Sequence, residues 1–245
     1  MSRLAPGAAA IVVALPWEAT PLAKHLGLTK SEVLDGVTRY HGWGGRLLLI
    51  QAGMGAHGAA RALTSLETPS LLLSAGFCGG LRPEIGLADI IIGSQVVRNT
   101  GSFPADPFLL ESASRAFKTI DCPVHVGTIL TVDEVVTPAD GIQGRAEPEI
   151  LAVEMESAHL AEAAQRHGVP FLAIRVVSDT PSAPWATEGR HLLKPDGRMN
   201  LASLATSLLR QPSRIPRLLH LASKLRPATR RLAQGIEALV KSLGA

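Results

Sequence analysis

The sequence predicts an α/β fold, and three observations carry that prediction. Apolar runs of strand length, at 10–15, 70–74 and 171–177, alternate with helix-like segments. Apart from Ser70, Ser74 and Arg175, these runs are apolar at successive positions rather than at every second residue, which is typical of strands covered on both faces. Aromatic residues make up only 4% of the chain, so small aliphatic side chains must fill the space between sheet and helices. A length of 245 residues suits one such domain with room for an appendage.

The remaining elements follow from periodicity and from breaker residues. A helix is expected to end at Gly27, and a second one at Gly168, because the residue just past a helix often adopts the left-handed conformation. The other expected elements are a helix at 19–26, a hairpin of 37–40 with 46–52, a helix at 59–66, strands at 90–97 and 124–131, a loop at 99–112, a helix at 112–119 and a helix at 157–167.

The cysteines and the N-terminal residues indicate the cellular compartment. Cys78 and Cys122 form no C-x-x-C pair and suggest no disulfide framework, which favours a reducing compartment. The apolar run at 8–15 is too short to span a bilayer and is interpreted as the first strand. We therefore expect a cytoplasmic protein, with the inner membrane face as a further possible location.

Charge divides the chain into two parts. Residues 1–200 hold 16 basic and 20 acidic side chains, whereas residues 201–245 hold eight basic ones and a single acid, Glu237. This predicts a domain at 1–200 and a basic amphipathic helical extension at 201–245, broken into about three short helices by Pro212, Pro216 and Pro227.

The extension has two interpretations. It packs on the domain or across a dimer with its arginines in solvent, or it touches anionic lipid headgroups. A nucleic-acid partner is disfavoured, because the positive charge is confined to the tail and aromatic residues are not interleaved with it.

Two glycine-rich stretches follow predicted strands. Residues 53–58 fit G-x-G-x-x-G, but the acidic residue expected about 20 positions later in a dinucleotide site is missing, so NAD and FAD are disfavoured. Residues 76–80 hold three glycines, and we expect a turn there that lets a ligand approach the backbone. The sequence points to no metal and no cofactor.

Three carboxylates stand at or just past the ends of predicted strands: Glu18, Glu156 and Asp179. Each could simply cap a helix or a turn. Ligands collect at the carboxyl ends of strands in α/β sheets, however, so three acids in such places together predict a site.

This order of elements resembles the nucleoside phosphorylase/nucleosidase superfamily, and within it the methylthioadenosine/S-adenosylhomocysteine nucleosidases. The motifs that carry the resemblance are Val-Glu-Met-Glu-Ser at 153–157 and Arg175-x-x-Ser178-Asp179. The resemblance implies a three-layer α/β/α fold with a central mixed, partly barrelled β-sheet, and makes 1–200 the catalytic domain. The basic tail has no expected counterpart in the ordinary nucleosidases and is similar to the hopanoid-associated branch, which acts on adenosylhopane.

The resemblance also assigns roles. Asp179 matches the general acid that protonates adenine N7, Ser178 orients it, and Glu18 matches the base that activates water. Burial of Asp179 would raise its pKa so that a proton is available. Substrate contacts are expected from Glu156 and Met155 at the ribose, Phe77 and Gly79 in the wall of the pocket, and Val135 and Val136 over the adenine.

Hydrolysis is favoured over phosphorolysis. Purine phosphorylases place Arg-x-x-Ser where this chain has Ser74-Ala75-Gly76-Phe77, so the phosphate ligands are missing. Val135 stands where the nucleosidases usually have Phe, so the base is less certain and futalosine hydrolysis is a neighbouring alternative. A non-catalytic nucleoside-binding or lipid-surface protein is a further alternative, and a homodimer is implied by resemblance.

Overall fold

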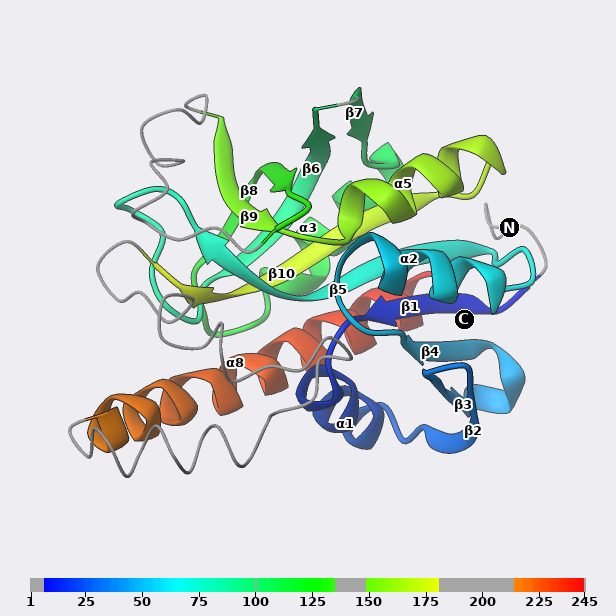
Figure 1. Ribbon diagram of the computed structural model, residues 1–245, viewed down its shortest axis with the longest axis horizontal. Coiled ribbons are helices and arrows are strands. Elements are labelled where there is room, and N and C mark those ends of the chain that lie inside the picture. The colour runs from blue at the N-terminus through cyan, green and yellow to red at the C-terminus, as the bar shows by residue number, and fades with distance from the viewer. Residues whose placement is uncertain (1–6, 100, 135–148, 181–213, 245) are drawn as a thin grey trace.

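The computed structural model describes residues 7–99, 101–134, 149–180 and 214–244 (Figure 1). The strands are β1 (Ala9–Val13), β2 (Thr29–Leu34), β3 (Val37–Gly42), β4 (Leu47–Gln51), β5 (Leu71–Gly80), β6 (Ile90–Arg98), β7 (Gly101–Pro104), β8 (Val124–Thr131), β9 (Ile150–Glu154) and β10 (Phe171–Asp179). The helices are α1 (Pro16–His25), the 3-10 turn η1 (Trp43–Gly45), α2 (Gly55–Thr64), α3 (Pro107–Phe117), α5 (Ser157–Arg166) and α8 (Arg214–Ser242).

The strands form one mixed sheet that is partly closed. Its order is β10-β6-β8-β9-β5-β1-β4-β3-β2, with β7 paired to β6. β10 also pairs with β5, so β5, β10, β6, β8 and β9 close into a barrel. β1, β5 and β10 run parallel, and their carboxyl ends therefore share one edge. The predicted fold class is confirmed.

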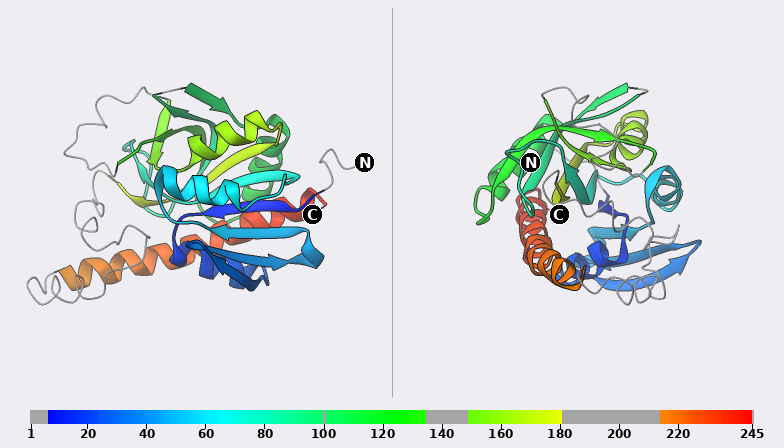
Figure 2. Two further views of the ribbon diagram at one scale, coloured as in Figure 1. Left: turned by 45° about the vertical axis from the view of Figure 1, so that its right-hand side comes forward. Right: turned by 60° about the vertical axis from the view of Figure 1, so that its left-hand side comes forward.

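The apolar runs exist because both faces of the sheet are covered. In β1, Ile11 and Val13 pack into one hydrophobic cluster while Ala10 and Val12 pack into another. Helices α1, α3 and α8 complete the first cluster, and α2 with α5 completes the second (Figures 1 and 2). Since successive residues of a strand point to opposite faces, every position had to be apolar.

Three local predictions are corrected by the structure. The expected loop at 99–112 contains β7 and the start of α3, where Asp106 accepts a hydrogen bond from Leu109 N at 2.9 Å and Pro107 opens the helix. The glycines at 76–80 lie inside β5 rather than in a turn after it. Strand β2 was not predicted, because its mixed sequence Thr-Lys-Ser-Glu-Val-Leu has neither an apolar run nor clean alternation.

The C-terminal helix is continuous from Arg214 to Ser242, so the predicted breaks at Pro216 and Pro227 are wrong, while Pro212 lies outside the described residues. α8 passes through Pro227 without a break. From Ala228 onward its apolar side chains are buried in the cluster that α1 and α3 share, and this packing offsets the hydrogen bond that proline removes. The buried residues are Ala228, Leu232, Ala233, Ile236, Leu239, Val240 and Leu243. The division of the chain at residue 200 stays a prediction.

Polar contacts fasten the end of α8 to α1 and to the turn before β4. Glu237 Oε2 lies 2.9 Å from His25 Nε2, and Arg46 donates to the Gly244 carbonyl at 3.4 Å. Lys241 and His25 hold the pKa of Glu237 below its ordinary value. In the part of the chain that the structure describes, no helix combines the length and apolarity needed to cross a bilayer.

Gly235 of α8 packs against Phe117 of α3, and its replacement tests this packing. A Cβ at Gly235 would lie 2.2 Å from the ring of the fully buried Phe117. We expect Gly235→Ala to lower the free energy of unfolding by about 1–3 kcal/mol, as overpacking does. The neighbouring Gln234→Ala, at a half-exposed position, should stay within about 0.5 kcal/mol of the parent. Equal urea midpoints for both variants would contradict the described helix contact.

Candidate active site

Glu18 folds back onto the turn between β1 and α1. Its Oε2 accepts hydrogen bonds from Ala14 N at 3.0 Å and Leu15 N at 2.7 Å, and its Oε1 accepts one from Phe77 N at 2.8 Å. The residue is 5% exposed. Burial raises the pKa of Glu18, although the three backbone donors oppose that rise. The simpler interpretation of Glu18 as a first-turn carboxylate is thus correct, and the same carboxylate also reaches across to β5.

Gly76 makes room for the Glu18 carboxylate. Its φ of +149° suits glycine, and a Cβ there would lie 2.6 Å from Glu18 Oε1 and 3.4 Å from Arg175 Nη1. Glu18, the β5 backbone and Arg175 therefore meet at one point. Any side chain at position 76 would displace the carboxylate.

A buried ion pair lies behind this point. Arg175 Nη2 donates to Glu154 Oε2 at 2.5 Å, to Ser74 Oγ at 2.7 Å and to Ser157 Oγ at 2.8 Å. The side chains of Arg175 and Glu154 are each 2% exposed. Glu154 accepts further hydrogen bonds from the hydroxyl of Thr131 at 2.5 Å and from the backbone N–H groups of residues 156 and 157.

The pair keeps Glu154 ionised. Burial alone would raise the pKa of Glu154, but the Arg175 guanidinium and the hydrogen bonds bring it below its ordinary value. From the sequence, Glu154 belonged only to the Val-Glu-Met-Glu-Ser motif and had no assigned role in the site. The cap exists, since Ser157 N donates to it at 2.9 Å, yet an arginine inside the apolar run of β10 was the signal that a buried acid must partner it.

Glu156 lies beside this pair and has the opposite protonation preference. Its Oε1 accepts a hydrogen bond from Gly55 N at 2.8 Å, while its Oε2 is 4.0 Å from Arg175 Nη2. Burial, with the negative charge of Glu154, raises the pKa of Glu156 to about 8. The glycine-rich turn at 53–58 thus holds a carboxylate instead of a pyrophosphate. The methyl carbon of Met155 lies close to Gly55 in the same turn. A Cβ added at Gly55 would be 3.7 Å from that carbon.

Asp179 and Ser178 end β10 next to the end of β5. Asp179 is in register with Gly79, and Ser178 Oγ donates to the Cys78 carbonyl at 3.2 Å. Both are half-buried, and the charge of Asp179 reaches the buried Cys78 thiol, whose pKa is raised chiefly by burial. Asp179 is four positions after Arg175 on the strand, a rise of about 13 Å along its backbone.

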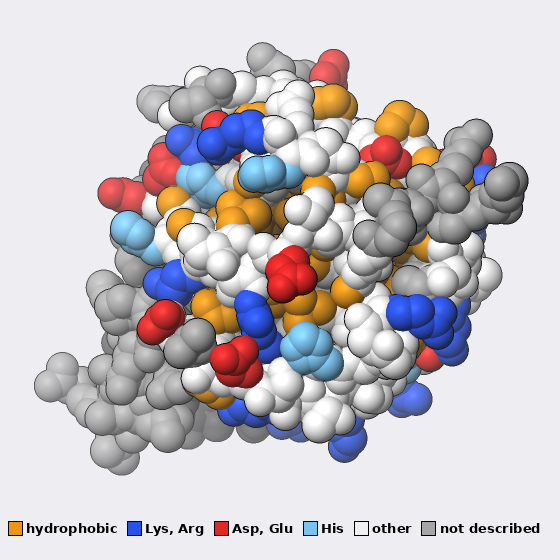
Figure 3. All heavy atoms as spheres, turned by 90° about the vertical axis from the view of Figure 1, so that its right-hand side faces the viewer, with side chains coloured by type: hydrophobic (Ala, Val, Ile, Leu, Met, Phe, Trp, Pro, Cys, Tyr) orange, Lys and Arg blue, Asp and Glu red, His pale blue; other side chains and the backbone are white. Residues whose placement is uncertain are grey.

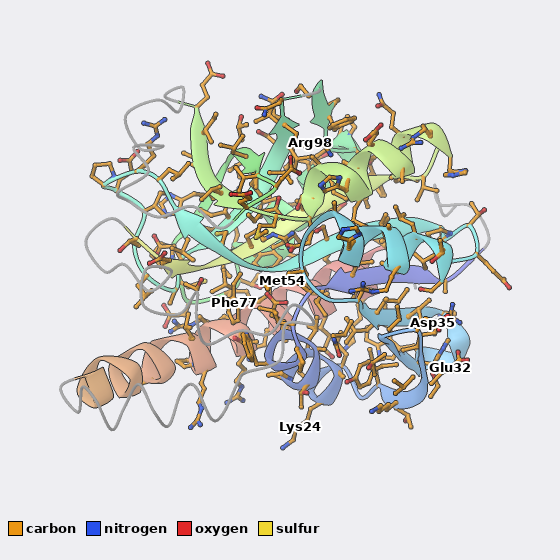
Figure 4. All side chains as sticks on the ribbon, in the orientation of Figure 1. Lys24, Glu32, Asp35, Met54, Phe77 and Arg98 are labelled. Carbon is orange, nitrogen blue, oxygen red and sulfur yellow. The ribbon has the colours of Figure 1, made fainter. Side chains whose placement is uncertain are left out.

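The structure brings the predicted residues Glu18, Phe77 and Glu156 into one cluster, with Met155 adjoining it. Gly79, Ser178 and Asp179 occupy the next positions outward on the same two strands. Figure 4 labels Met54, which immediately precedes α2, and Phe77, which lies on β5. Val135 and Val136 lie outside the described residues. Among the described residues there is no cluster of histidine, cysteine or acidic side chains that could hold a metal ion.

A groove of about 280 Å³ lies on the other edge of the sheet. It is lined by residues that precede β5 and β10, such as Pro69 and Val169, and by the ends of α2 and α5. That edge faces the viewer in Figure 3, where acidic and basic side chains are interspersed. The carboxylates of the candidate site lie away from this groove, at the carboxyl ends of the strands.

Comparison with known proteins gives a family and a fold. The family model described as "Phosphorylase superfamily" matches residues 8–210. A 5'-methylthioadenosine/S-adenosylhomocysteine nucleosidase of Oceanobacillus iheyensis is 26% identical over 187 residues, which cover 67% of this chain and 81% of the relative.

Two solved structures share the fold at lower identity. The 5'-methylthioadenosine/S-adenosylhomocysteine nucleosidase of Neisseria meningitidis, in complex with methylthio-immucillin-A, has a TM-score of 0.72 at 22% identity and covers 96% of this chain and 99% of its own. The futalosine hydrolase of Helicobacter pylori has a TM-score of 0.72 at 18% identity, covering 96% and 98%. Because this coverage must extend past residue 200, the expectation that the tail has no counterpart in ordinary nucleosidases is wrong.

The raised pKa of Glu156 predicts a pH-dependent stability. The folded chain keeps a proton on Glu156 between the ordinary glutamate value of 4.5 and about 8, whereas the unfolded chain releases it. The contribution of Glu156 to the free energy of unfolding is therefore fully present below pH 4.5 and is lost as the pH rises toward 8. Glu156→Gln should flatten this part of the curve in urea unfolding, and the exposed Glu67→Gln should not. Parallel curves for parent and Glu156→Gln would contradict the environment described for Glu156.

Proposed function

Because the chain belongs to the phosphorylase superfamily, we propose that it is a nucleosidase that hydrolyses the N-glycosidic bond of a 5'-substituted adenosine and releases adenine. One observation carries the choice of water over phosphate: the Glu18 carboxylate fills the space beside Gly76 and Phe77 N. A phosphate dianion there would meet the Glu18 carboxylate, while Arg175 is already engaged by Glu154.

The proposed reaction divides acid and base work between two carboxyl groups, as glycosidases do. Asp179, oriented by Ser178, gives a proton to N7 of the base as the bond between C1' and N9 breaks. Glu18 takes a proton from the water whose oxygen bonds to C1'. The products are adenine and the 5-substituted ribose. The raised pKa of Glu18 brings it closer to neutral pH, where a general base is most effective.

The other predicted contacts complete the proposal. Glu156 accepts hydrogen bonds from the ribose hydroxyls, and Met155 packs on the sugar. Phe77 and Gly79 form the wall of the base pocket, and Val135 and Val136 cover the adenine. The likeness of the Oceanobacillus iheyensis relative supports a 5'-thio substituent such as that of 5'-methylthioadenosine or S-adenosylhomocysteine. The fold of the futalosine hydrolase keeps futalosine as an alternative substrate. We also propose that the chain forms a homodimer, and light scattering on the purified chain tests this.

Adenine release with and without phosphate tests the proposal. We expect release from 5'-methylthioadenosine, S-adenosylhomocysteine or adenosylhopane in phosphate-free buffer. Asp179→Asn and Glu18→Gln should each lower kcat about 10²–10⁴-fold, the usual contribution of a general acid or base. The exposed pair Asp121→Asn and Glu67→Gln are matched controls that should retain activity. Adenine that appears only with phosphate would make the chain a phosphorylase, and full turnover by Asp179→Asn would overturn the mechanism.

The finer proposal is that the substrate is lipid-borne, as adenosylhopane is, and that the chain touches a membrane surface through its tail. It is supported by the first half of α8, whose backbone extends past the body of the molecule (Figures 1 and 2). Residues 197–236 contain eight basic side chains and no acid. Arg226 and Arg230, which lie in this stretch, are exposed. Each basic residue near an anionic membrane surface contributes about 1 kcal/mol to the free energy of binding.

Charge reversal is a better test of the tail than truncation, because α8 is part of the core from Ala228 onward. The triple variant Lys224→Glu, Arg226→Glu, Arg230→Glu should lose flotation with phosphatidylglycerol vesicles. A control with the exposed Lys24, Lys30 and Lys118 changed to Glu should float as the parent does. Both should release adenine from a soluble nucleoside at the parental rate. Equal flotation of the two triple variants would contradict the membrane contact.

A further inference from the structure

The turn between β5 and β6 contains a buried acid that the proposed chemistry does not use. Asp89 is 7% exposed and directly precedes β6. Its Oδ2 accepts a hydrogen bond from Gly86 N at 2.8 Å and lies 2.9 Å from Nε2 of His125, on the neighbouring strand β8. The backbone closes the same turn, since Asp89 N donates to the Gly86 carbonyl at 3.3 Å. The Asp89 side chain therefore joins the two ends of the turn at 86–89 to β8.

Ala88 has a backbone conformation in this turn that alanine disfavours. Its φ is +75°, at the third position of the turn, where glycine or asparagine is usual because other side chains are strained. A strained residue persists only where its surroundings hold it in place. The carboxylate of the next residue, Asp89, provides such a restraint, because it is bonded to Gly86 at the start of the turn.

The turn is bonded to β10 directly before the proposed general acid. Ala88 N donates to the Val177 carbonyl at 2.8 Å, and Val177 N donates to the Asp89 carbonyl at 2.9 Å. Both backbone groups of Val177 are thus engaged by the turn. The next two residues of the strand are Ser178 and Asp179, the proposed orienting residue and the proposed acid.

The position of Asp179 depends on this edge of β10, because the other edge is irregular. The register of β10 against β5 shifts between Val177 and Asp179. Such an irregularity interrupts the ladder locally, as a β-bulge does, and bulges commonly redirect side chains next to active sites. The hydrogen bonds between Val177 and the turn therefore help to set where the strand carries Asp179.

We propose that Asp89 is a positioning residue: it holds the turn that binds Val177 and thereby places Asp179 against the base of the bound nucleoside. This inference rests on the proposed function, because it concerns the general acid of the same reaction. Asp89 acts through Asp179 and not by contact with the substrate. Its loss should slow proton transfer to the base and leave the ribose contacts of Glu156 unchanged.

Three variants separate this role from a general loss of stability. Asp89→Ala removes both side-chain contacts and should lower kcat about 10–100-fold, the cost of a misplaced catalytic group, with KM nearly unchanged. Asp89→Asn keeps an oxygen that can accept from Gly86 N and from the His125 ring, so it should restore most of kcat. The exposed Glu84→Ala, in the same loop, is the matched control and should behave as the parent.

A double-mutant cycle shows whether Asp89 acts through the general acid. Once Asp179→Asn has removed the acid, the further change Asp89→Ala should not lower kcat again in single-turnover assays. A general role in stability would instead lower kcat by the same factor in both backgrounds. Equal losses in the two backgrounds would therefore overturn the proposal, as would a parental kcat in Asp89→Ala alone.

A milder variant keeps the test valid if Asp89→Ala does not fold. His125→Ala removes one contact from the Asp89 carboxylate at a position whose side chain is 26% exposed. It should lower kcat about 2–10-fold, the effect of losing a hydrogen bond, and this loss should vanish when Asp179→Asn is also present. A loss that persists beside Asp179→Asn would contradict the proposed link.

Amide hydrogen exchange tests the structural step without turnover. In Asp89→Ala the amides of Ala88 and Val177 should exchange about 10-fold faster than in the parent, whereas Asp89→Asn should keep their protection. Unchanged protection in Asp89→Ala would overturn the proposal. A parent chain that releases no adenine from any nucleoside would instead overturn the proposed function, and this inference with it, even where the exchange result is as expected.

Discussion

The arrangement of the site depends on the buried ion pair between Arg175 and Glu154. An arginine inside a strand covered on both faces is destabilising unless its charge is compensated in place. Glu154 compensates it, Ser74 and Ser157 accept further hydrogen bonds from Arg175, and Thr131 donates to Glu154. These groups come from β5, β8, β9, β10 and the start of α5, so the pair ties the barrel strands together at the edge where the proposed substrate site lies. Among the described residues, Arg175 Nε has no hydrogen-bond partner.

The same pair distributes charge among the neighbouring carboxylates. Arg175 keeps Glu154 ionised. The negative charge of Glu154 in turn favours the protonated form of Glu156. Glu18 lies on the other side of Arg175 and is held by backbone donors near Gly76 and Phe77. Three acids of one cluster thus differ in proton affinity through their surroundings alone.

Much of this could be predicted from the sequence, because the relevant signals are local. Apolar runs that end in an acid place Glu18 and Asp179 at strand ends, and parallel strands bring those ends to one edge. What could not be predicted depends on contacts between distant residues. No spacing rule joins Arg175 to Ser74, which is 101 residues away. The rule that proline breaks a helix failed at Pro227, since burial of the following residues of α8 against α1 and α3 outweighs it.

The central claim is that the Arg175–Glu154 pair keeps one buried carboxylate charged and leaves its neighbour protonated. A carbon-13 NMR titration of the glutamate carboxyl groups, assigned with Glu154→Gln and Glu156→Gln, tests it most directly. The account predicts that Glu154 stays ionised from the ordinary value of 4.5 upward, while Glu156 titrates at about 8. Two carboxyl groups that both titrate at the ordinary glutamate value would contradict it.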